Sequence, residues 1–387
     1  MSNVGPGPSA LVRALASAAI LALVGLLGCS APLEAAQGTA LVSMPAAGAV
    51  ELVDLATGRV LTHTVVGKLP HNLLPAPDGK SVFVSLVGSQ AIAEVDAATG
   101  RLRRTFLSEP VPKTRKDGSV IQEHIDEDAF SATSCYACHN TIIGSRPFGM
   151  AFSEDKSELF VTNIRSGNLS TIDLASGAIR DLVHMPAEGE VHEATGIARL
   201  GDALFVSVTA TQPSSQPALL RRLDAESLMM LSESETGPDA PVLLADPSRQ
   251  QLYASNRETN TVSRFDAQGH FVGTLTVGNS PIGLVLSKDQ KKLVVANFYD
   301  GTVSVVDLAS GSSQQIELAL GQESFANPTH LALSADGRYA YVVSAAPKQG
   351  YLLQLDLSSH RVLRAIPVGG LGYDIAILPV SPIPRQP

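Results

Sequence analysis

The sequence predicts an all-β protein, a seven-bladed β-propeller of four-stranded blades. Three observations lead to this fold class. The composition combines 44% hydrophobic residues with only 17% charged residues, 32 glycines and 24 prolines, which is typical of many short strands joined by tight turns. One two-strand pattern recurs along the chain. Corresponding positions in the repeats lie 41 to 47 residues apart, the length of one four-stranded propeller blade.

The recurring pattern is an apolar strand that ends in Asn or Ser, a polar turn, and an alternating strand that ends in Asp. The three clearest copies are Leu159–Asn163 with Leu169–Asp173, Leu252–Asn256 with Val262–Asp266, and Leu293–Asn297 with Val303–Asp307. Weaker copies start at Ala40, Val82, Leu204 and Ala340. The total is seven, and we therefore expect seven blades.

A further strand precedes most copies and ends in a hairpin turn. It is seen most clearly from Pro70 to Asp78-Gly79, from Pro147 to Asp155 and from Pro281 to Asp289. An Asp-Gly or Asp-Lys pair between two short strands favours a tight hairpin. The corresponding starting positions further along the chain are Pro147, Ala194, Ala240, Pro281, Pro328 and Gly372.

The two ends of the repeat region predict how the ring closes. The region begins with the second strand of a blade (Ala40–Met44) and finishes with a lone first strand (Tyr373–Leu378). If these strands pair, neither leaves an exposed sheet edge.

These patterns resemble the YVTN family of bacterial β-propeller repeats over about residues 39–378. The resemblance implies a seven-bladed ring, the number that the repeat count gives independently. The chain has no Trp, which argues against tryptophan-aspartate repeats and against quinoprotein propellers with tryptophan docking motifs.

Residues 1–28 read as a lipoprotein signal peptide. Arg13 is its one basic residue, and Ala14–Gly28 is an apolar run too short to span a bilayer comfortably. The run ends in Leu26-Leu27-Gly28-Cys29, which resembles a bacterial lipobox and implies acylation of Cys29, followed by a linker over 29–38. The alternative is an ordinary cleaved signal with a chance cysteine. We expect an exported protein with a lipid anchor, on the periplasmic side of a bacterial membrane or at the cell surface, with the outer membrane favoured.

A 36-residue excess separates two of the repeats. It spans about 110–145 and contains Cys135 and Cys138, two residues apart, followed directly by His139. This is the attachment signature of c-type haem: two thiols add to the two vinyl groups of one porphyrin, and the imidazole ligates the iron. We expect one covalent haem c per chain. The alternative is a disulfide or a small metal site that includes the two cysteines.

The second iron ligand has four histidine candidates. His71, His192 and His330 each stand where the chain enters a first strand, so they should gather near one mouth of the central channel, and His124 lies within the insert. Each is also compatible with a structural role, and the three mouth histidines could instead hold a separate iron or copper ion.

Two other residues near the insert each have two possible roles. Arg146 either pairs with a haem propionate or anchors the exit of the insert. Met150 is a tempting iron ligand, but it aligns with the inward apolar position of the first strands and is expected to be a core residue.

The predicted function is electron transfer, between partner proteins or in support of a separately encoded redox enzyme. The net charge of −9, with no basic run, argues against nucleic acid as a partner. A redox partner protein and a monomeric state are expected. If the sixth iron position is open, the protein is instead an oxidoreductase acting on a small ligand. A third reading is a non-redox binding or scaffold propeller. Residues 379–387 are a short C-terminal tail.

Overall fold

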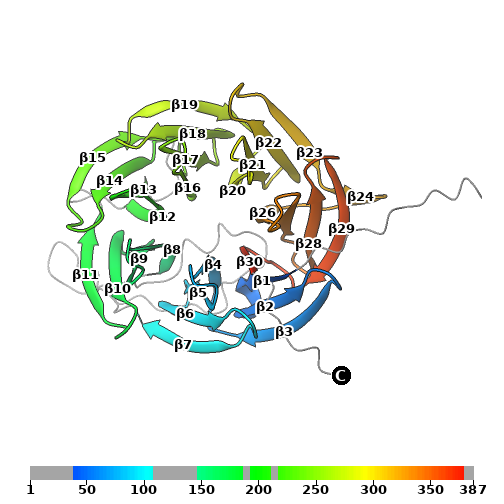
Figure 1. Ribbon diagram of the computed structural model, residues 1–387, viewed down its shortest axis with the longest axis horizontal. Helices are drawn as coiled ribbons and strands as arrows, with labels where there is room; N and C mark the ends of the chain where they lie inside the picture. The colour runs from blue at the N-terminus through cyan, green and yellow to red at the C-terminus, as the bar shows by residue number, and fades with distance from the viewer. Residues whose placement is uncertain (1–37, 108–145, 186–191, 211–216, 379–387) are drawn as a thin grey trace, which may run out of the picture. The chain divides into compact units, whose positions relative to one another are not determined.

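The protein is an all-β, seven-bladed propeller, as the sequence predicts. The computed structural model describes residues 38–107, 146–185, 192–210 and 217–378. In this part of the chain, seven four-stranded antiparallel sheets are arranged around a common axis (Figure 1), and a central channel runs along it. Each sheet runs outward from a first strand at the channel to a fourth strand at the rim. We number the blades 1 to 7 by the order of their first strands along the chain.

The strands fall into four sets according to their place in the blade. The first strands are β4 (Pro70–Pro75), β8 (Pro147–Phe152), β12 (His192–Leu200), β16 (Leu243–Asp246), β20 (Pro281–Leu286), β26 (Pro328–Leu333) and β30 (Ile375–Leu378). The second strands are β5 (Ser81–Leu86), β9 (Glu158–Asn163), β13 (Ala203–Ala210), β17 (Gln251–Asn256), β21 (Lys292–Asn297), β27 (Tyr339–Ser344) and β1 (Thr39–Met44). The third strands are β6 (Ala91–Asp96), β10 (Asn168–Asp173), β14 (Leu219–Asp224), β18 (Thr261–Asp266), β22 (Thr302–Asp307), β28 (Gly350–Asp356) and β2 (Ala49–Asp54). The fourth strands are β7 (Leu102–Leu107), β11 (Ile179–His184), β15 (Met230–Glu235), β19 (Phe271–Thr276), β23 (Ser313–Glu317), β29 (Arg361–Val368) and β3 (Arg59–Val65).

Two short elements were not predicted from the sequence. A hairpin of β24 (Ala319–Leu320) and β25 (Glu323–Ser324) lies outside the ring beside β29 (Figure 1). A single turn of 3-10 helix, η1 (Pro45–Ala47), joins β1 to β2.

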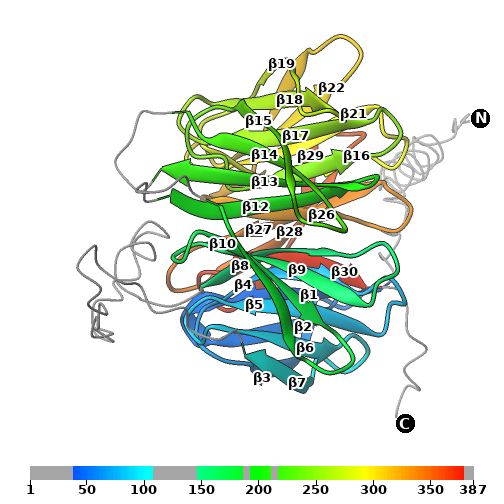
Figure 2. The ribbon, with the colours of Figure 1, turned by 90° about the vertical axis from the view of Figure 1, so that its left-hand side faces the viewer.

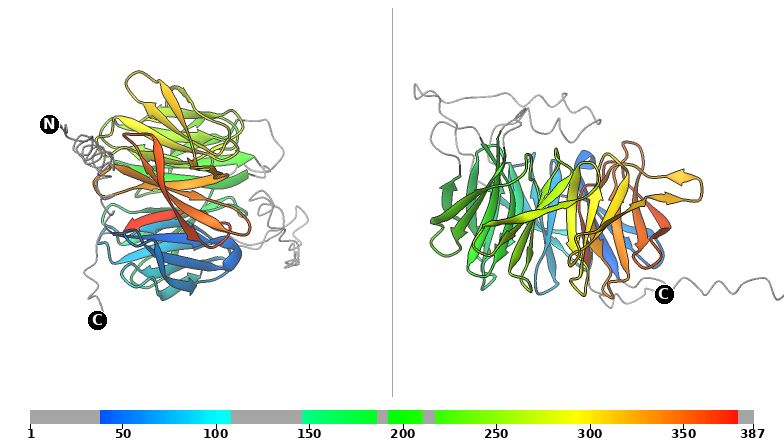
Figure 3. Two further views of the ribbon diagram at one scale, coloured as in Figure 1. Left: turned by 90° about the vertical axis from the view of Figure 1, so that its right-hand side faces the viewer. Right: turned by 90° about the horizontal axis from the view of Figure 1, so that it is seen from above.

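The core lies between the blades. Every residue of β5 and all but the last of β6 are buried, whereas β3 at the rim is mostly exposed. The middle strands are apolar on both faces because a neighbouring blade covers each face (Figures 2 and 3). In one such layer Leu41 and Val50 of blade 7 pack with Val82 and Val84 of blade 1.

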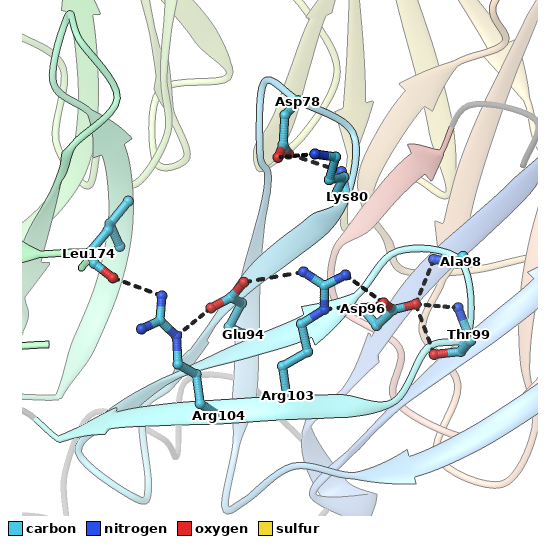
Figure 4. Close-up of polar contacts among 9 residues, drawn as sticks. All are labelled: Asp78, Lys80, Glu94, Asp96, Ala98, Thr99, Arg103, Arg104 and Leu174. Carbon is cyan, nitrogen blue, oxygen red and sulfur yellow. Dashed lines mark hydrogen bonds and ion pairs between the residues drawn. The ribbon is translucent and has the colours of Figure 1, made fainter. Parts of the chain in front are cut away.

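The turn after each third strand is built on one aspartate. In all seven blades this carboxylate accepts backbone N–H bonds from residues two to four positions later; the seven are Asp54, Asp96, Asp173, Asp224, Asp266, Asp307 and Asp356. Figure 4 shows the turn of blade 1, where Asp96 accepts the N–H of Ala98 at 3.0 Å and that of Thr99 at 2.8 Å. In the same view, Arg104 donates to the carbonyl of Leu174 in blade 2 at 2.7 Å, which links the two rims. The aspartate that ends each sequence repeat is therefore a turn-forming residue.

The ring closes as predicted. β1 pairs with β30 in antiparallel register, from Thr39 with Leu378 to Val42 with Ile375. The regular ladder starts two residues later than the predicted strand, because Tyr373 and Asp374 both pair with Ser43: the N–H of Tyr373 donates to the Ser43 carbonyl and the N–H of Ser43 donates to the Asp374 carbonyl, each at 3.0 Å.

Several predicted segments lie outside the described residues. They are the signal peptide, nearly all of the 29–38 linker, the 110–145 insert and the 379–387 tail. The chain leaves blade 1 at Leu107 in its rim strand and is described again from Arg146, just before the first strand of blade 2. None of the helices in the described part of the chain has the length and hydropathy of a membrane span.

Candidate functional site in the central channel

The third residue of each first-strand segment forms a ring around the channel. Counted from the starting positions found in the sequence, this channel ring consists of Asn72, Gly149, Gly196, Val242, Gly283, His330 and Asp374. All but Gly283 line a cavity of about 180 Å³. Apolar side chains from the next position, including Met150, Ile197 and Leu243, complete its wall.

Three ring positions are glycine because neighbouring first strands approach very closely there. A Cβ atom on Gly149 would lie 2.6 Å from the carbonyl oxygen of Thr195 in the next blade, and one on Gly283 would lie 2.7 Å from the Cα of His330. No side chain fits at these distances. The polar side chains that line the channel therefore come from other blades.

His330 presents a hydrogen-bond acceptor. Its Nδ1 lies 3.1 Å from the carbonyl oxygen of Tyr373, so Nδ1 carries the proton and donates it. Burial lowers the pKa of His330 and outweighs the opposing effects of Asp374 and the Tyr373 carbonyl, which keeps the imidazole neutral. Nε2 is then a lone-pair acceptor. It is buried, and no described residue forms a hydrogen bond with it.

Asp374 and Asn72 add further acceptors beside His330. Asp374 accepts the N–H of Leu73 at 2.8 Å, and burial raises the pKa of its carboxyl group against the attraction of His330 and the N–H bonds. The side-chain Oδ1 of Asn72 is buried and likewise lacks a hydrogen-bond partner in the described part of the chain. These three side chains belong to blades 6, 7 and 1, which follow one another around the ring (Figure 1).

His71 stands one position earlier in its segment and has a different environment. Its ring packs 4.5 Å from that of Tyr373 and 5.8 Å from that of Phe148, measured between centroids, and the residue is 2% exposed. Its Nδ1 lies 3.1 Å from the carbonyl oxygen of Leu69 and donates to it. His330 contacts the same Tyr373 ring at 4.8 Å. The structure thus brings two of the predicted histidines to one tyrosine.

The remaining predicted site residues are described in part or not at all. His192 begins β12, where its backbone pairs with Ala210, but its side chain is outside the description. Arg146 is 1% exposed with φ 41°, and its carbonyl accepts the N–H of Ile164 at 3.0 Å. Cys29, His124, Cys135, Cys138 and His139 lie outside the described residues, and their roles stay predictions.

Met150 is a core residue, as its alignment predicts. It is 8% exposed and packs with Phe83, Ile92 and Phe106 between blades 1 and 2. Among the described residues, no group of three His, Cys, Asp or Glu side chains could hold a metal ion. The second-metal hypothesis included His192, so it stays a prediction.

Sequence reasoning missed Asn72 and Asp374. One signal could have found them: where three of the aligned segments carry glycine, these two and His330 carry polar side chains. A change from glycine to a polar residue at an inward position marks a break in the structural repeat.

A larger groove of about 740 Å³ lies beside the turns of blades 2 and 3. Its carboxylates mostly serve those turns. Asp155, for example, accepts hydrogen bonds from the hydroxyls of Ser153 and Ser157, which lower its pKa to about 2. Glu154 pairs with Arg199 at 2.7 Å. The carboxylates that line this groove are therefore explained largely by their hydrogen bonds within the turns.

The fold and its channel define this chain as a closed β-propeller. The YNCE-like beta-propeller family model matches residues 9–324, and the chain belongs to this family. No curated protein matches the sequence.

Solved structures share the fold at low sequence identity. The periplasmic gluconolactonase of Pseudomonas aeruginosa is 18% identical with a TM-score of 0.62, over 89% of this chain and 99% of the other. Hydrazine synthase of Kuenenia stuttgartiensis is 15% identical with a TM-score of 0.60, over 79% and 88%. A functionally unknown protein of Desulfotomaculum acetoxidans is 12% identical with a TM-score of 0.62, over 88% and 99%. These similarities define the fold alone.

Proposed function

We propose that this propeller is an exported, lipid-anchored c-type cytochrome that carries one covalent haem and transfers electrons to or from a partner protein. The observation that carries the proposal is the Cys135-x-x-Cys138-His139 motif. Cys135 and Cys138 would form the thioether bonds, and His139 would be the proximal ligand. Bound haem would supply the one-electron chemistry.

The cysteine inventory supports this assignment. The chain has three cysteines, and two of them form the haem motif. Cys29 stands in the lipobox-like sequence and would carry lipid, so no thiol is left over in an oxidising compartment. The donor set of two thiols and one imidazole fits a haem c, because a zinc site of this type normally needs four protein ligands.

The size of the channel bears on where a haem would lie. A cavity of about 180 Å³ is smaller than the ~300 Å³ at which pockets for drug-sized ligands begin, and a porphyrin would not enter it. The haem would rest on the face of the propeller. His71 stays a candidate second ligand, and because its ring is buried against those of Tyr373 and Phe148, it would reach a haem on this face only if these rings move apart.

The test is to express the full chain in a host with cytochrome c maturation machinery. We expect a Soret band, a pyridine haemochrome spectrum of haem c, and a mass increased by one haem. The Cys135→Ala/Cys138→Ala double variant should lose all three. Cys29→Ser is the matched control: it should keep the haem and leave the membrane fraction. An unmodified polypeptide mass in the presence of working maturation would overturn the proposal.

Carbon monoxide then distinguishes an electron carrier from a ligand-binding enzyme. If the reduced haem is six-coordinate, carbon monoxide should not change its spectrum. If His71 is the second ligand, the His71→Ala variant should bind carbon monoxide. Binding by the unmodified protein would instead favour an oxidoreductase that acts on a small ligand at the channel mouth.

A further inference from the structure

We propose that the rim of blades 6, 7 and 1 binds a bilayer surface that contains anionic phospholipids. We call this surface the arginine edge; it consists of Arg361, Arg59 and Arg101, which stand at the start of the rim strands β29, β3 and β7, and of the turns before them. The orientation that the edge gives the propeller rests on the proposed lipid anchor at Cys29, whereas binding by the edge does not.

One position of the blade carries arginine only at this edge. It is the residue that pairs with the turn aspartate where the rim strand starts. In blades 6, 7 and 1, which follow one another around the ring, it is Arg361, Arg59 and Arg101 (Figure 1). The equivalent residues of blades 2 to 5 are Ala178, Met229, His270 and Ser312. The turn forms with any of these residues, so its folding does not explain three neighbouring arginines.

The three guanidinium groups are free to bind a ligand. Arg59, Arg101 and Arg361 are exposed, and none of their side chains forms an ion pair or a hydrogen bond with another described residue. Three nearby turn carboxylates already have other basic partners: Asp78 with Lys80 and Asp96 with Arg103 (Figure 4), and Asp356 with Arg338. The three arginines are therefore a local surplus of positive charge.

The net charge of −9 does not oppose this assignment, because it is unevenly distributed. The groove beside the turns of blades 2 and 3 is lined by six acidic residues and one basic residue, Arg199. Exposed charges more than about 10 Å apart are largely screened at 0.1 M salt. A phosphate group at the arginine edge would therefore meet mainly the guanidinium groups, which match phosphate oxygens in geometry and charge.

Apolar side chains accompany two of the arginines. Val60 and Leu102 directly follow Arg59 and Arg101, and they are 41% and 39% exposed. Basic and apolar groups side by side are typical of protein surfaces that lie at the headgroup level of a bilayer.

The place where the chain enters the propeller also favours a bilayer. The carbonyl of Gly38 accepts the N–H of Leu55, next to the turn aspartate Asp54 of blade 7. The chain therefore enters the ring within the arginine edge. Cys29 stands nine positions before Gly38, and nine residues span at most about 32 Å. A lipid on Cys29 would keep this edge close to the membrane.

The contact would set the orientation of the propeller. β7 runs from the arginine edge to Leu107 at the opposite face of the ring, and Arg146 precedes β8 at that same opposite face. These are the described residues on either side of the 110–145 insert. With the arginine edge on the bilayer, this face would point away from the membrane and towards a redox partner.

The test is vesicle sedimentation of the mature chain made without lipid, with Cys29→Ser and with residues 1–28 replaced by a signal peptide that is cleaved without lipidation. We expect reversible binding to vesicles of phosphatidylglycerol and phosphatidylcholine that weakens as salt is added, and no binding to phosphatidylcholine alone. No binding to the mixed vesicles, or equal binding to both kinds, would overturn the proposal. The lipid anchor is tested separately by the membrane fraction of the parent chain, so the two failures are distinguishable.

Variants connect the binding to the edge. Arg59→Gln/Arg101→Gln should weaken binding to the mixed vesicles at least tenfold, because each basic residue near an anionic surface strengthens binding about fivefold. Arg361→Gln added to this pair should weaken it further. Lys68→Gln/Lys348→Gln is the charge-matched control: it removes two exposed cations at the opposite face and should bind like the parent. Circular dichroism checks that each variant folds. Unchanged binding in the arginine variants, or an equal loss in the lysine variant, would contradict the proposed edge.

Discussion

The turn after the third strand and the channel ring occupy equivalent positions in every blade, yet they use polar residues in opposite ways. The turn has an aspartate in all seven blades, and each accepts backbone N–H bonds. The channel ring changes from blade to blade, and two of its polar atoms, in Asn72 and His330, lack hydrogen-bond partners among the described residues.

The two regions therefore differ in what a polar group does for stability. A polar residue that recurs and is fully bonded stabilises the repeat unit. A polar residue that breaks the repeat and is left unbonded lowers the stability of the folded chain. The same operation, removal of a polar group, should therefore have opposite signs in the two regions.

The largest effect is expected at the turn of blade 6. Asp356 accepts bonds from the hydroxyl of Ser358 at 2.5 Å and from the N–H of Ser359 at 2.9 Å, and it contacts Arg338. Asp356→Ala should lower the free energy of unfolding by about 3 kcal/mol, because several bonds to a charged group are lost together. Urea denaturation measures this. Asp202→Ala, at an exposed aspartate, should change stability by less than about 0.5 kcal/mol. Equal effects at the two sites would contradict the structural role of the turn.

The contribution of Asp356 to stability should also appear in the pH dependence of the free energy of unfolding. Burial alone would raise the pKa of Asp356, but the hydrogen bonds from Ser358 and Ser359 and the charge of Arg338 outweigh it and lower the pKa to about 2. A carboxyl group with a lowered pKa in the folded state stabilises that state above its ordinary pKa of 3.8, and the contribution is lost as the pH falls from there towards 2. Asp356→Asn should therefore flatten the loss of stability between pH 4 and about 2. Denaturation series at several pH values test this, and an unchanged slope would contradict it.

The smallest effect, and the one of opposite sign, is expected in the channel. Asn72→Leu removes an acceptor that no described residue satisfies and replaces it with an apolar group of similar shape. The free energy of unfolding should stay the same or rise by up to about 1 kcal/mol. Thermal and urea denaturation measure this, and a clear loss of stability would mean that Asn72 is a structural residue.

Much of the fold could be predicted because its determinants are local and repeated. The aspartate that ends each third strand bonds to residues within four positions, so the sequence pattern and the contact coincide, as at Asp96. Closure of the ring followed from counting strands at the two ends. Met150 was assigned to the core because five other repeats offered apolar residues at the same position for comparison, and its burial confirms that assignment.

The channel site could not be predicted in the same way. Leu73 and Asp374 are hydrogen-bonded across 301 residues of sequence, and His330 reaches Tyr373 across 43. Whether a buried nitrogen or oxygen has a partner depends on every neighbour that closure of the ring brings to the axis. The haem motif differs from the channel in this respect. Its five consecutive residues can be recognised in the sequence alone, whereas the residues that would surround a haem stay a prediction.

By itself, the sequence determined the blade, the number of blades and the way the ring closes, since each depends on short-range patterns that seven copies repeat. Only the tertiary structure decided which polar groups meet at the axis and which of them remain unbonded. The physical reason is that the hydrogen-bond partners of a polar group at the axis come from several blades, so the sequence of a single repeat does not reveal them.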